Sequence, residues 1–243
     1  QRERITAVIP IHSFDQETYL IAVTKRGTIK KMDLAQFDTN RKAGLIAINL
    51  KDDDQLIGIK KTSGESNVII VTKQGKCICF SEQDVRPMGR LAAGVKSMTL
   101  DKGDEVVAMD LAEQDDELLV VTQSGYGKRT SLDEYRVQSR GGKGLLTYNK
   151  GKFTKTGELI GAMAVKESDE ILLINSDGII IRIKASEVSR LGRATQGVKI
   201  MKVEEEANII ALAKVVGEDA EVEEDGIDGP EDQSSQITMD TES

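Results

Sequence analysis

Apolar residues along this chain gather in short runs, and the runs are joined in pairs by a two-residue turn that ends in glycine. Each pair is typical of a β-hairpin, because glycine permits the positive φ angle that a tight turn between strands requires. The runs are apolar on both faces rather than cleanly alternating, which indicates strands buried on both sides by neighbouring sheets. The turn glycines are Gly27, Gly75, Gly125 and Gly178, separated by 48, 50 and 53 residues.

Two further markers recur after each hairpin. A second glycine follows the turn glycine by 17 to 19 residues, and a closing apolar run ends the unit. With one strand from the intervening segment, each unit holds about four strands, and no long amphipathic helix competes with this pattern. A strand-rich repeat of about 50 residues predicts an all-β fold, a β-pinwheel or propeller-like array of four-stranded blades. The second glycines are Gly44, Gly94, Gly144 and Gly197.

These markers divide the chain into units. The run at residues 4–8 resembles the closing run at residues 55–59, so we expect residues 1–14 to form the last strand of a preceding blade. Because the chain opens on Gln1 within such a strand, we expect it to be part of a longer protein. The predicted blades are residues 15–62, 63–112, 113–165 (with the glycine-rich loop described below) and 166–216, followed by a disordered acidic tail at 217–243.

The distribution of charge changes the picture that net charge alone would give. The chain carries a formal charge of −8, but residues 217–243 hold eleven acidic residues and no Lys or Arg. Without these eleven, 30 acidic residues face 33 basic ones, so residues 1–216 carry +3. A mildly basic body with an acidic extension is typical of a protein that binds a polyanion.

An arginine stands three or four residues before the second glycine in every unit: Arg41, Arg90, Arg140 and Arg193. In a radial array, equivalent positions lie on one rim, so the repeat predicts a basic belt along one edge. Such a belt suits a phosphate backbone, and a curved belt suits bent duplex DNA. The alternative is the solvated charged rim of a propeller that binds proteins. Further cations near these arginines are Lys42, Arg86, Lys96, Arg136, Lys143, Arg190 and Lys199.

Catalytic and metal-binding chemistry finds few candidates. His12 is the only histidine, so triads and His-based metal sites lack parts, and we expect neither catalytic residues nor a metal site. Cys77 and Cys79 are too close for an ordinary disulfide and are expected to be buried thiols. The four tyrosines are expected to be structural. No apolar run reaches the roughly 18 residues of a membrane-spanning helix, so we expect no membrane contact.

One loop combines three glycines with an arginine and a lysine, a composition that can present backbone N–H groups and two cations to an anion. This loop resembles the Q-R-R-G-G-K-G box in the C-terminal domain of the bacterial DNA gyrase A subunit, with serine where the family usually has a basic residue. The stretches ERITAVIPI, LIAVTKRGTIKK, GYGKRT and LGRATQGV are also similar to that family, and the resemblance covers essentially the whole chain. The loop consists of Gln138, Ser139, Arg140, Gly141, Gly142, Lys143 and Gly144.

The resemblance implies a β-pinwheel, usually of six blades, in which neighbouring blades exchange strands. It implies that duplex DNA wraps around the outer rim and that the wrap lets the parent enzyme, an ATP-hydrolysing type II topoisomerase, introduce negative supercoils. The chain itself would need no cofactor, since ATP and magnesium act through other regions. The implied partners are double-stranded DNA, the gyrase B subunit, which joins the parent complex, and the rest of the homodimeric gyrase A protein. The implied location is the bacterial cytoplasm, at the nucleoid.

The family's box usually lies in the first blade, whereas the similar loop here lies in the third of four units, so we expect the full box upstream. Two alternatives remain open: the C-terminal domain of the topoisomerase IV A subunit, or a propeller-like protein-interaction module. Under the DNA-binding hypothesis, the expected DNA contacts are Arg41, Lys42, Arg86, Arg90, Lys96, Lys128, Arg129, Arg136, Arg140, Lys143, Arg190, Arg193 and Lys199.

Overall fold

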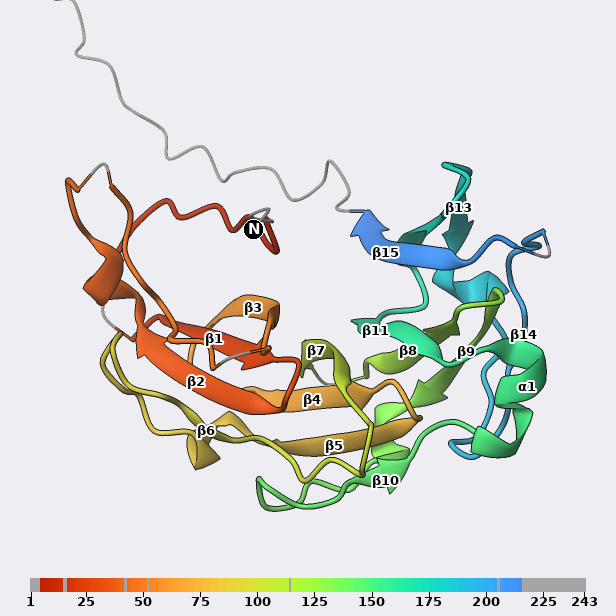
Figure 1. Cartoon of the computed structure of the whole chain (residues 1–243), viewed down its shortest axis with the longest axis horizontal. Helices are drawn as coiled ribbons and strands as arrows, with labels where there is room; N and C mark the ends of the chain where they lie inside the picture. Colours follow the sequence, from red (N-terminus) through yellow and green to blue (C-terminus); the bar gives the residue numbers. More distant parts are fainter. Residues whose placement is uncertain are drawn as a thin grey trace, which may run out of the picture.

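Four small antiparallel sheets follow one another around an open arc (Figure 1). The computed structural model describes residues 5–14, 17–41, 43–51, 53–113, 115–204 and 206–215. The all-β array of four repeats predicted from the hairpin spacing is therefore confirmed. Short 3₁₀ turns and one helical turn connect the strands: η1 (Leu34–Phe37), η2 (Glu82–Asp84), η3 (Leu132–Glu134), η4 (Lys150–Lys152), α1 (Phe153–Thr156) and η5 (Ala185–Glu187).

Each sheet runs from an inner strand near the middle of the arc to an outer strand on its periphery (Figure 1). From the inner to the outer edge, sheet 1 is β3 (Leu56–Thr62), β1 (Tyr19–Thr24), β2 (Thr28–Asp33) and β6 (Val95–Lys96). Sheet 2 is β7 (Val106–Ala112), β4 (Asn67–Thr72), β5 (Lys76–Ser81) and β10 (Leu145–Leu146). Sheet 3 is β11 (Leu159–Val165), β8 (Glu117–Thr122), β9 (Tyr126–Ser131) and β14 (Val198–Lys199). Sheet 4 is β15 (Ile209–Val215), β12 (Glu170–Asn175) and β13 (Ile180–Lys184).

The outer strand of sheets 1 to 3 comes from the following repeat. β6 pairs with β2, β10 with β5 and β14 with β9, although each outer strand lies more than one whole repeat further along the chain than its partner. Every one of these repeats therefore reaches back to complete the sheet of the repeat before it. The strand exchange implied by the resemblance is present, and it ties the neighbouring blades together with backbone hydrogen bonds.

The second glycine of each unit makes this exchange possible. Gly144 has a φ of +71°, and a Cβ atom placed on it would lie 2.5 Å from the carbonyl oxygen of Cys77 on the receiving strand. Gly197 has the same conformation, and its Cβ would lie 2.6 Å from the oxygen of Gly127. Only glycine combines this left-handed conformation with so close an approach of two backbones. The spacing of this glycine therefore marks where the chain crosses from one blade to the next.

The hydrophobic core lies between the sheets. Along β4, Val68 and Ile70 pack into the cluster shared with sheet 1, whereas Ile69 and Val71 pack into the cluster shared with sheet 3. Side chains alternate across a strand, so a sheet stacked on both faces must be apolar at every position. This confirms the interpretation of the doubly apolar runs as strands buried on both sides.

Sheet 4 differs from the predicted four-stranded blade because it has three strands among the described residues. In the other sheets the outer strand comes from the following repeat, whereas among the described residues β13 has an open edge, on which Ile180 is 58% exposed. At the other end of the arc, a Cβ atom placed on Gly44 would meet no atom within 4 Å. The exchange segment of the first repeat therefore has no receiving strand among the described residues, although it has the same glycine conformation, with φ at +75°.

Two expectations for the chain ends have different outcomes. Residues 5–14 form no strand, and Ile5 and Val8 are 87% and 85% exposed, so the predicted closing strand of a preceding blade is absent here. A strand needs a neighbour to satisfy its backbone groups, and no described strand forms a backbone ladder with this segment, although Ile9 packs against the core of sheet 1. The predicted disordered tail at 217–243 lies outside the described residues. Among the described helices, none is long and apolar enough to cross a membrane.

Candidate nucleic-acid interface

Three of the arginine loops occupy equivalent places on successive sheets. Each loop enters by donating a backbone hydrogen bond to the fourth residue after the hairpin glycine of the preceding repeat. Because this register is the same three times, Arg90, Arg140 and Arg193 stand two residues beyond equivalent anchor points. The three hydrogen bonds are Met88 N to Lys31 O at 2.9 Å, Gln138 N to Cys79 O at 2.9 Å and Leu191 N to Arg129 O at 2.8 Å.

The loops are also joined to one another along the outer edge of the arc. The residue five positions after Gly44, Gly94 and Gly144 donates a hydrogen bond to the arginine loop of the next repeat. The result is a hydrogen-bonded strip of loops that carries the arginines past three blade junctions. The bonds are Asn49 Nδ2 to Leu91 O at 3.1 Å, Thr99 N to Gly142 O at 2.8 Å and Asn149 N to Thr195 O at 3.2 Å.

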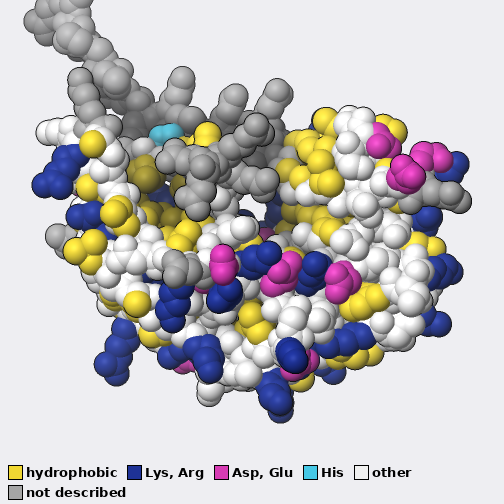
Figure 2. All heavy atoms as spheres, viewed as in Figure 1, with side chains coloured by type: hydrophobic (Ala, Val, Ile, Leu, Met, Phe, Trp, Pro, Cys, Tyr) yellow, Lys and Arg dark blue, Asp and Glu magenta, His cyan; other side chains and the backbone are white. Residues whose placement is uncertain are grey.

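Most of the predicted DNA contacts have accessible side chains. Figure 2 shows lysines and arginines projecting along the lower, outer edge of the arc, while the carboxylates in this view lie mostly nearer its middle and toward the end formed by sheet 4. Arg90, Arg140 and Arg193 are half-buried in their loops. Lys42 lies outside the described residues. The exposed members of the predicted set are Arg41, Arg86, Lys96, Arg136, Lys143, Arg190 and Lys199.

The prediction was wrong for Lys128 and Arg129, which are 0% and 4% exposed. Lys128 Nζ donates hydrogen bonds to the backbone oxygens of Gly192, at 2.6 Å, and Arg193, at 2.5 Å. Arg129 forms a buried ion pair with Glu117 and donates from Nε to the oxygen of Val188 at 2.9 Å. Both cations lie on β9 between stacked blades, where their donors are used internally, so neither can reach a phosphate.

The glycine-rich loop is held by Arg140 itself. Its Nε donates to the backbone oxygen of Asp84 at 3.3 Å, and its Nη1 donates to the backbone oxygen of Lys96. The guanidinium is therefore fixed in orientation rather than free to sweep through solvent. Lys143 in the same loop is exposed. The loop thus combines one cation held by hydrogen bonds, Arg140, with one that is exposed to solvent, Lys143.

Sequence reasoning missed the residues that receive these loops. Gln36, Asp84 and Glu134 each accept a hydrogen bond from the backbone N–H of the arginine in the next repeat. Each lies nine residues after a hairpin glycine, in a 3₁₀ turn that ends the hairpin. The shared offset was visible in the sequence, but three different side chains at that position gave no reason to single it out.

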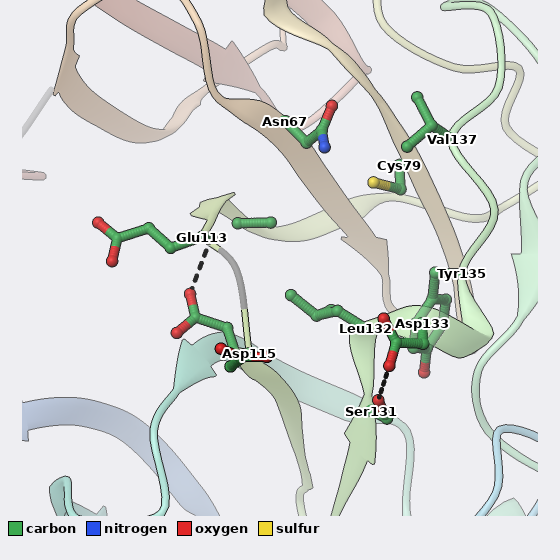
Figure 3. A pocket seen from close by; sticks show the side chains of 11 residues that line it. Asn67, Cys79, Glu113, Asp115, Ser131, Leu132, Asp133, Tyr135 and Val137 are labelled. Atoms are coloured by element: carbon green, nitrogen blue, oxygen red, sulfur yellow. Dashed lines mark hydrogen bonds between the residues drawn. The ribbon is translucent and has the colours of Figure 1, made fainter.

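A hollow of about 450 Å³ between sheets 2 and 3 offers a second place to look for a site (Figure 3). Its lining includes Cys79 and several carboxylates, among them Asp115 and Asp133, the latter accepting a hydrogen bond from Ser131 Oγ at 3.3 Å. Burial raises the pKa of the Cys79 thiol to about 11, so the thiol is a poor nucleophile at neutral pH. Clustered carboxylates repel phosphates, so this hollow is not part of a DNA surface.

The remaining chemistry is sparse in the part of the chain that the structure describes. No group of three or more His, Cys, Asp or Glu side chains there is placed to hold a metal ion. Cys77 and Cys79 are buried free thiols, as expected from their spacing. Tyr135 and Tyr148 are buried in the core, at 3% and 0% exposure, which leaves their hydroxyls to structural hydrogen bonds.

Comparison with known proteins agrees with this geometry. A family model described as DNA gyrase C-terminal domain, beta-propeller, matches the chain four times, at residues 18–63, 66–113, 116–166 and 169–215. The chain is 42% identical over 223 residues to the DNA gyrase A subunit of Mycolicibacterium smegmatis, and the match covers 91% of this chain and 26% of that protein. It is 47% identical over 223 residues to the Clostridium acetobutylicum protein of the same name, covering 92% and 27%. The chain thus spans about a quarter of the length of these relatives.

Solved structures show the same architecture. A C-terminal domain of DNA topoisomerase IV superposes with a TM-score of 0.80 at 32% identity, covering 85% of this chain and 64% of that one. A DNA gyrase A C-terminal domain superposes with a TM-score of 0.77 at 30% identity, covering 84% and 68%. With four matched repeats, strands exchanged between blades and arginine loops on the outer edge, this chain belongs to the DNA gyrase C-terminal domain family.

Proposed function

We propose that this chain binds duplex DNA along its outer edge and bends it, as the DNA-wrapping part of a DNA gyrase A subunit. The observation that carries the proposal is the bonded strip of arginine loops. Equivalent anchor points on three successive sheets hold Arg90, Arg140 and Arg193, and each loop is bonded to the segment before it. A curved row of fixed cations matches a curved row of phosphates.

The physical chemistry of the strip favours binding without base recognition. Each phosphate neutralised by Lys or Arg releases counterions and adds about 0.9 to the slope of log K against log salt. Bending a site of 20–30 base pairs by 40–90° costs on the order of 1–6 kcal/mol, which several charge-assisted contacts can offset. The described residues include no helix longer than one turn that would enter a major groove. Binding is therefore expected to depend on salt far more than on sequence.

In the parent enzyme, the bent duplex would be presented to the strand-passage machinery, so that ATP-driven passage introduces negative supercoils. ATP, magnesium and the strand-cleaving tyrosine would belong to other regions of the A and B subunits. The chain would act in the bacterial cytoplasm, on nucleoid DNA. Under this proposal the described domain contributes geometry, and the rest of the enzyme contributes catalysis.

A second candidate is the corresponding domain of topoisomerase IV, favoured by the superposition at a TM-score of 0.80. The two candidates predict different reactions for the parent enzyme. Joined to a gyrase core, the chain should support ATP-dependent negative supercoiling of relaxed plasmid. If it supports only decatenation and relaxation, the topoisomerase IV assignment is the better one.

The binding proposal is tested with matched triple variants of the 243-residue chain. Replacing Arg90, Arg140 and Arg193 with alanine should weaken binding to a mixed-sequence duplex and reduce the salt slope by up to about 2.7. Because Arg140 also holds its loop, a second variant replaces exposed lysines with glutamine: Lys96, Lys143 and Lys199.

The control removes equal charge from exposed positions on or beside the inner strands: Lys61, Lys166 and Lys214. If net charge alone drove binding, control and rim variants would lose affinity equally. The proposal predicts a clear loss only for the rim variants, with thermal unfolding used to confirm that each remains folded. Unchanged affinity in both rim variants, or negligible binding by the parent chain in moderate salt, would favour the protein-interaction module instead.

A further inference from the structure

Arg90, Arg140 and Arg193, called here the rim arginines, are each held by the repeat before their own. The backbone N–H of Arg90 donates to Gln36 Oε1 at 3.0 Å, and that of Arg193 donates to Glu134 Oε2 at 3.2 Å. At the middle junction the N–H of Arg140 donates to Asp84 Oδ2 at 3.2 Å. The three acceptors lie at the same offset from their hairpin glycines, so one structural device recurs at every junction in the described arc.

At two of these junctions the preceding repeat also holds the carbonyl of the arginine. Lys30 Nζ donates to the oxygen of Arg90, and Lys128 Nζ donates to the oxygen of Arg193 at 2.5 Å. Both lysines are 0% exposed and lie three residues after a hairpin glycine. A single arginine peptide is thus held at its N–H by one side chain and at its carbonyl by another.

The middle junction replaces the lysine with an apolar residue. Ile78 stands at the equivalent position, and its Cδ1 lies 3.7 Å from the place where a Cβ on Gly142 would be. There the guanidinium of Arg140 itself attaches the loop to its neighbours, by donating hydrogen bonds to the backbone oxygens of Asp84 and Lys96. The N–H acceptor is therefore common to all three junctions, whereas in the glycine-rich loop the side chain of the arginine stands in for the lysine in holding the loop.

We propose that Gln36, Asp84 and Glu134 are positioning residues that hold the rim arginines ready for DNA, a role that rests on the proposed function. The residues on either side of Arg90, Arg140 and Arg193 are exposed or half-buried, so no core contact orders the arginine peptide. Ordering a loose peptide on binding would weaken its affinity for DNA. A side-chain acceptor from the neighbouring blade orders the loop in advance. The affinity of each rim arginine then depends on a residue that does not itself contact DNA.

The identity of the acceptor also sets the charge beside the arginine. Glu134 Oε2 lies 3.8 Å from Nε of Arg193, so its carboxylate offsets part of the cation that faces DNA. Gln36 supplies the same acceptor geometry to Arg90 without the negative charge. Glutamine therefore already serves as the acceptor at the first junction, so Glu134→Gln should preserve the hydrogen bond at the third.

The fourth repeat shows the acceptor without a loop to hold. Glu187 stands nine residues after Gly178, but no described arginine loop follows it onto sheet 4. Its carboxylate instead accepts a hydrogen bond of 3.4 Å from the backbone N–H of Lys184, within its own turn. The residue nine positions after the hairpin glycine therefore accepts a hydrogen bond across a blade junction only where the arginine loop of the next repeat lies beside it.

Two substitutions at one position separate geometry from charge. Glu134→Gln keeps the acceptor and removes the carboxylate, so binding to a labelled mixed-sequence duplex should tighten about twofold, as expected for one weak surface charge pair. Glu134→Leu removes the same charge and also the acceptor. It should bind about fivefold more weakly than Glu134→Gln, the equivalent of one hydrogen bond of about 1 kcal/mol.

The outcomes are distinct. If the chain fails to bind duplex DNA, the proposed function fails and the positioning role with it. If the chain binds but both substitutions tighten binding equally, charge alone matters and the positioning role is overturned. Tighter DNA binding by Glu134→Gln, together with weaker binding by Glu134→Leu than by Glu134→Gln, supports the positioning role. A residue needed only for folding would not strengthen DNA binding when its charge is removed.

A second measurement guards against misfolding of the leucine variant. Amide hydrogen exchange at Arg193 should be protected in the free parent chain and in Glu134→Gln, but accelerated about fivefold in Glu134→Leu. The same pair can be made at the first junction, where Gln36→Glu retains an acceptor and Gln36→Leu does not. Unchanged exchange at Arg193 and Arg90 in both leucine variants would overturn the positioning role without any DNA present.

Discussion

Lys128 in the third repeat donates a hydrogen bond of 2.5 Å from its buried ammonium to the backbone oxygen of Arg193 in the fourth. The contact joins residues 65 positions apart, across a blade junction. It explains why a lysine that looks like a DNA contact in the sequence is absent from the surface. Its donors hold the loop that carries Arg193 in place.

Stability should depend on pH through Lys128. The pKa of its ammonium falls from 10.5 to about 8, chiefly because of burial, with Glu134 opposing the shift and nearby Arg193 adding to it. Between about pH 8 and 10.5 the unfolded chain binds more protons than the folded chain, so this group's contribution to the free energy of unfolding rises with pH. The neutral amine still has two N–H donors for its two carbonyl partners.

Lys128→Met is the matched variant, because methionine fills a similar volume without titrating. Urea unfolding of both proteins between about pH 7 and pH 10 should show that the free energy of unfolding of the parent chain, taken relative to that of the variant, rises with pH. The difference isolates Lys128, because the buried thiols, whose pKa values are raised, titrate in both proteins. Parallel curves for the two proteins would show that Lys128 keeps an ordinary pKa.

Replacing the exchange glycines should cost stability in proportion to what lies beside them. Gly144→Ala places a Cβ 2.5 Å from a backbone oxygen at a φ of +71°, and we expect a loss of about 2–4 kcal/mol from strain and overlap together. Gly44→Ala has nearly the same φ, +75°, with no atom within 4 Å, and should cost about 1 kcal/mol. Chemical denaturation measures both, and equal losses would contradict the close approach of the backbones.

Arg129 should be needed for folding rather than for DNA. It forms a buried ion pair with Glu117 and donates a hydrogen bond to the oxygen of Val188. Arg129→Ala leaves Glu117 with only its exposed partner Arg190 and removes the donor to Val188, so it should cost about 2–3 kcal/mol. Arg136→Ala removes an exposed cation from the same repeat and should change the free energy of unfolding by less than about 0.5 kcal/mol. In DNA binding at a temperature where both variants are folded, the order reverses, with the larger loss at Arg136. A large affinity loss in folded Arg129→Ala would restore its predicted contact role.

The two thiols should resist alkylation in the folded chain. Burial raises the pKa of Cys79 from 9.0 to about 11, and that of Cys77 is raised as well. The thiolate fraction at neutral pH falls about 100-fold for a shift of two units, so iodoacetamide should react slowly until the chain is unfolded in urea. Rapid labelling of the folded chain, followed by mass spectrometry, would show that this part of the core opens.

The acidic tail at residues 217–243 is expected to compete with DNA for the arginine loops on the outer edge. Truncation after Val216 removes eleven acidic residues, so it should tighten DNA binding most at low salt, where charge interactions are least screened. The alternative is a solubility segment with no effect on binding. Identical salt titrations of the truncated and full chains would support that alternative.

The repeat architecture was open to prediction because local rules specify it. A tight hairpin turn needs glycine at residues such as Gly75, and a strand buried on both faces needs unbroken apolar runs. Both signals survive in a single sequence. The arginine three or four residues before the second glycine followed from the same register, which is why the rim arginines could be named in advance.

The sequence by itself determined that four hairpin units of about 50 residues repeat and that each carries an arginine shortly before its second glycine. Only the tertiary structure decided which cations are free, because exposure depends on contacts between residues far apart in the chain. Lys128 and Arg136 are eight positions apart, yet one is sealed beneath the loop of the next repeat and the other faces solvent. Strand exchange produces that difference, since it brings each repeat's loop down onto the strand of its predecessor.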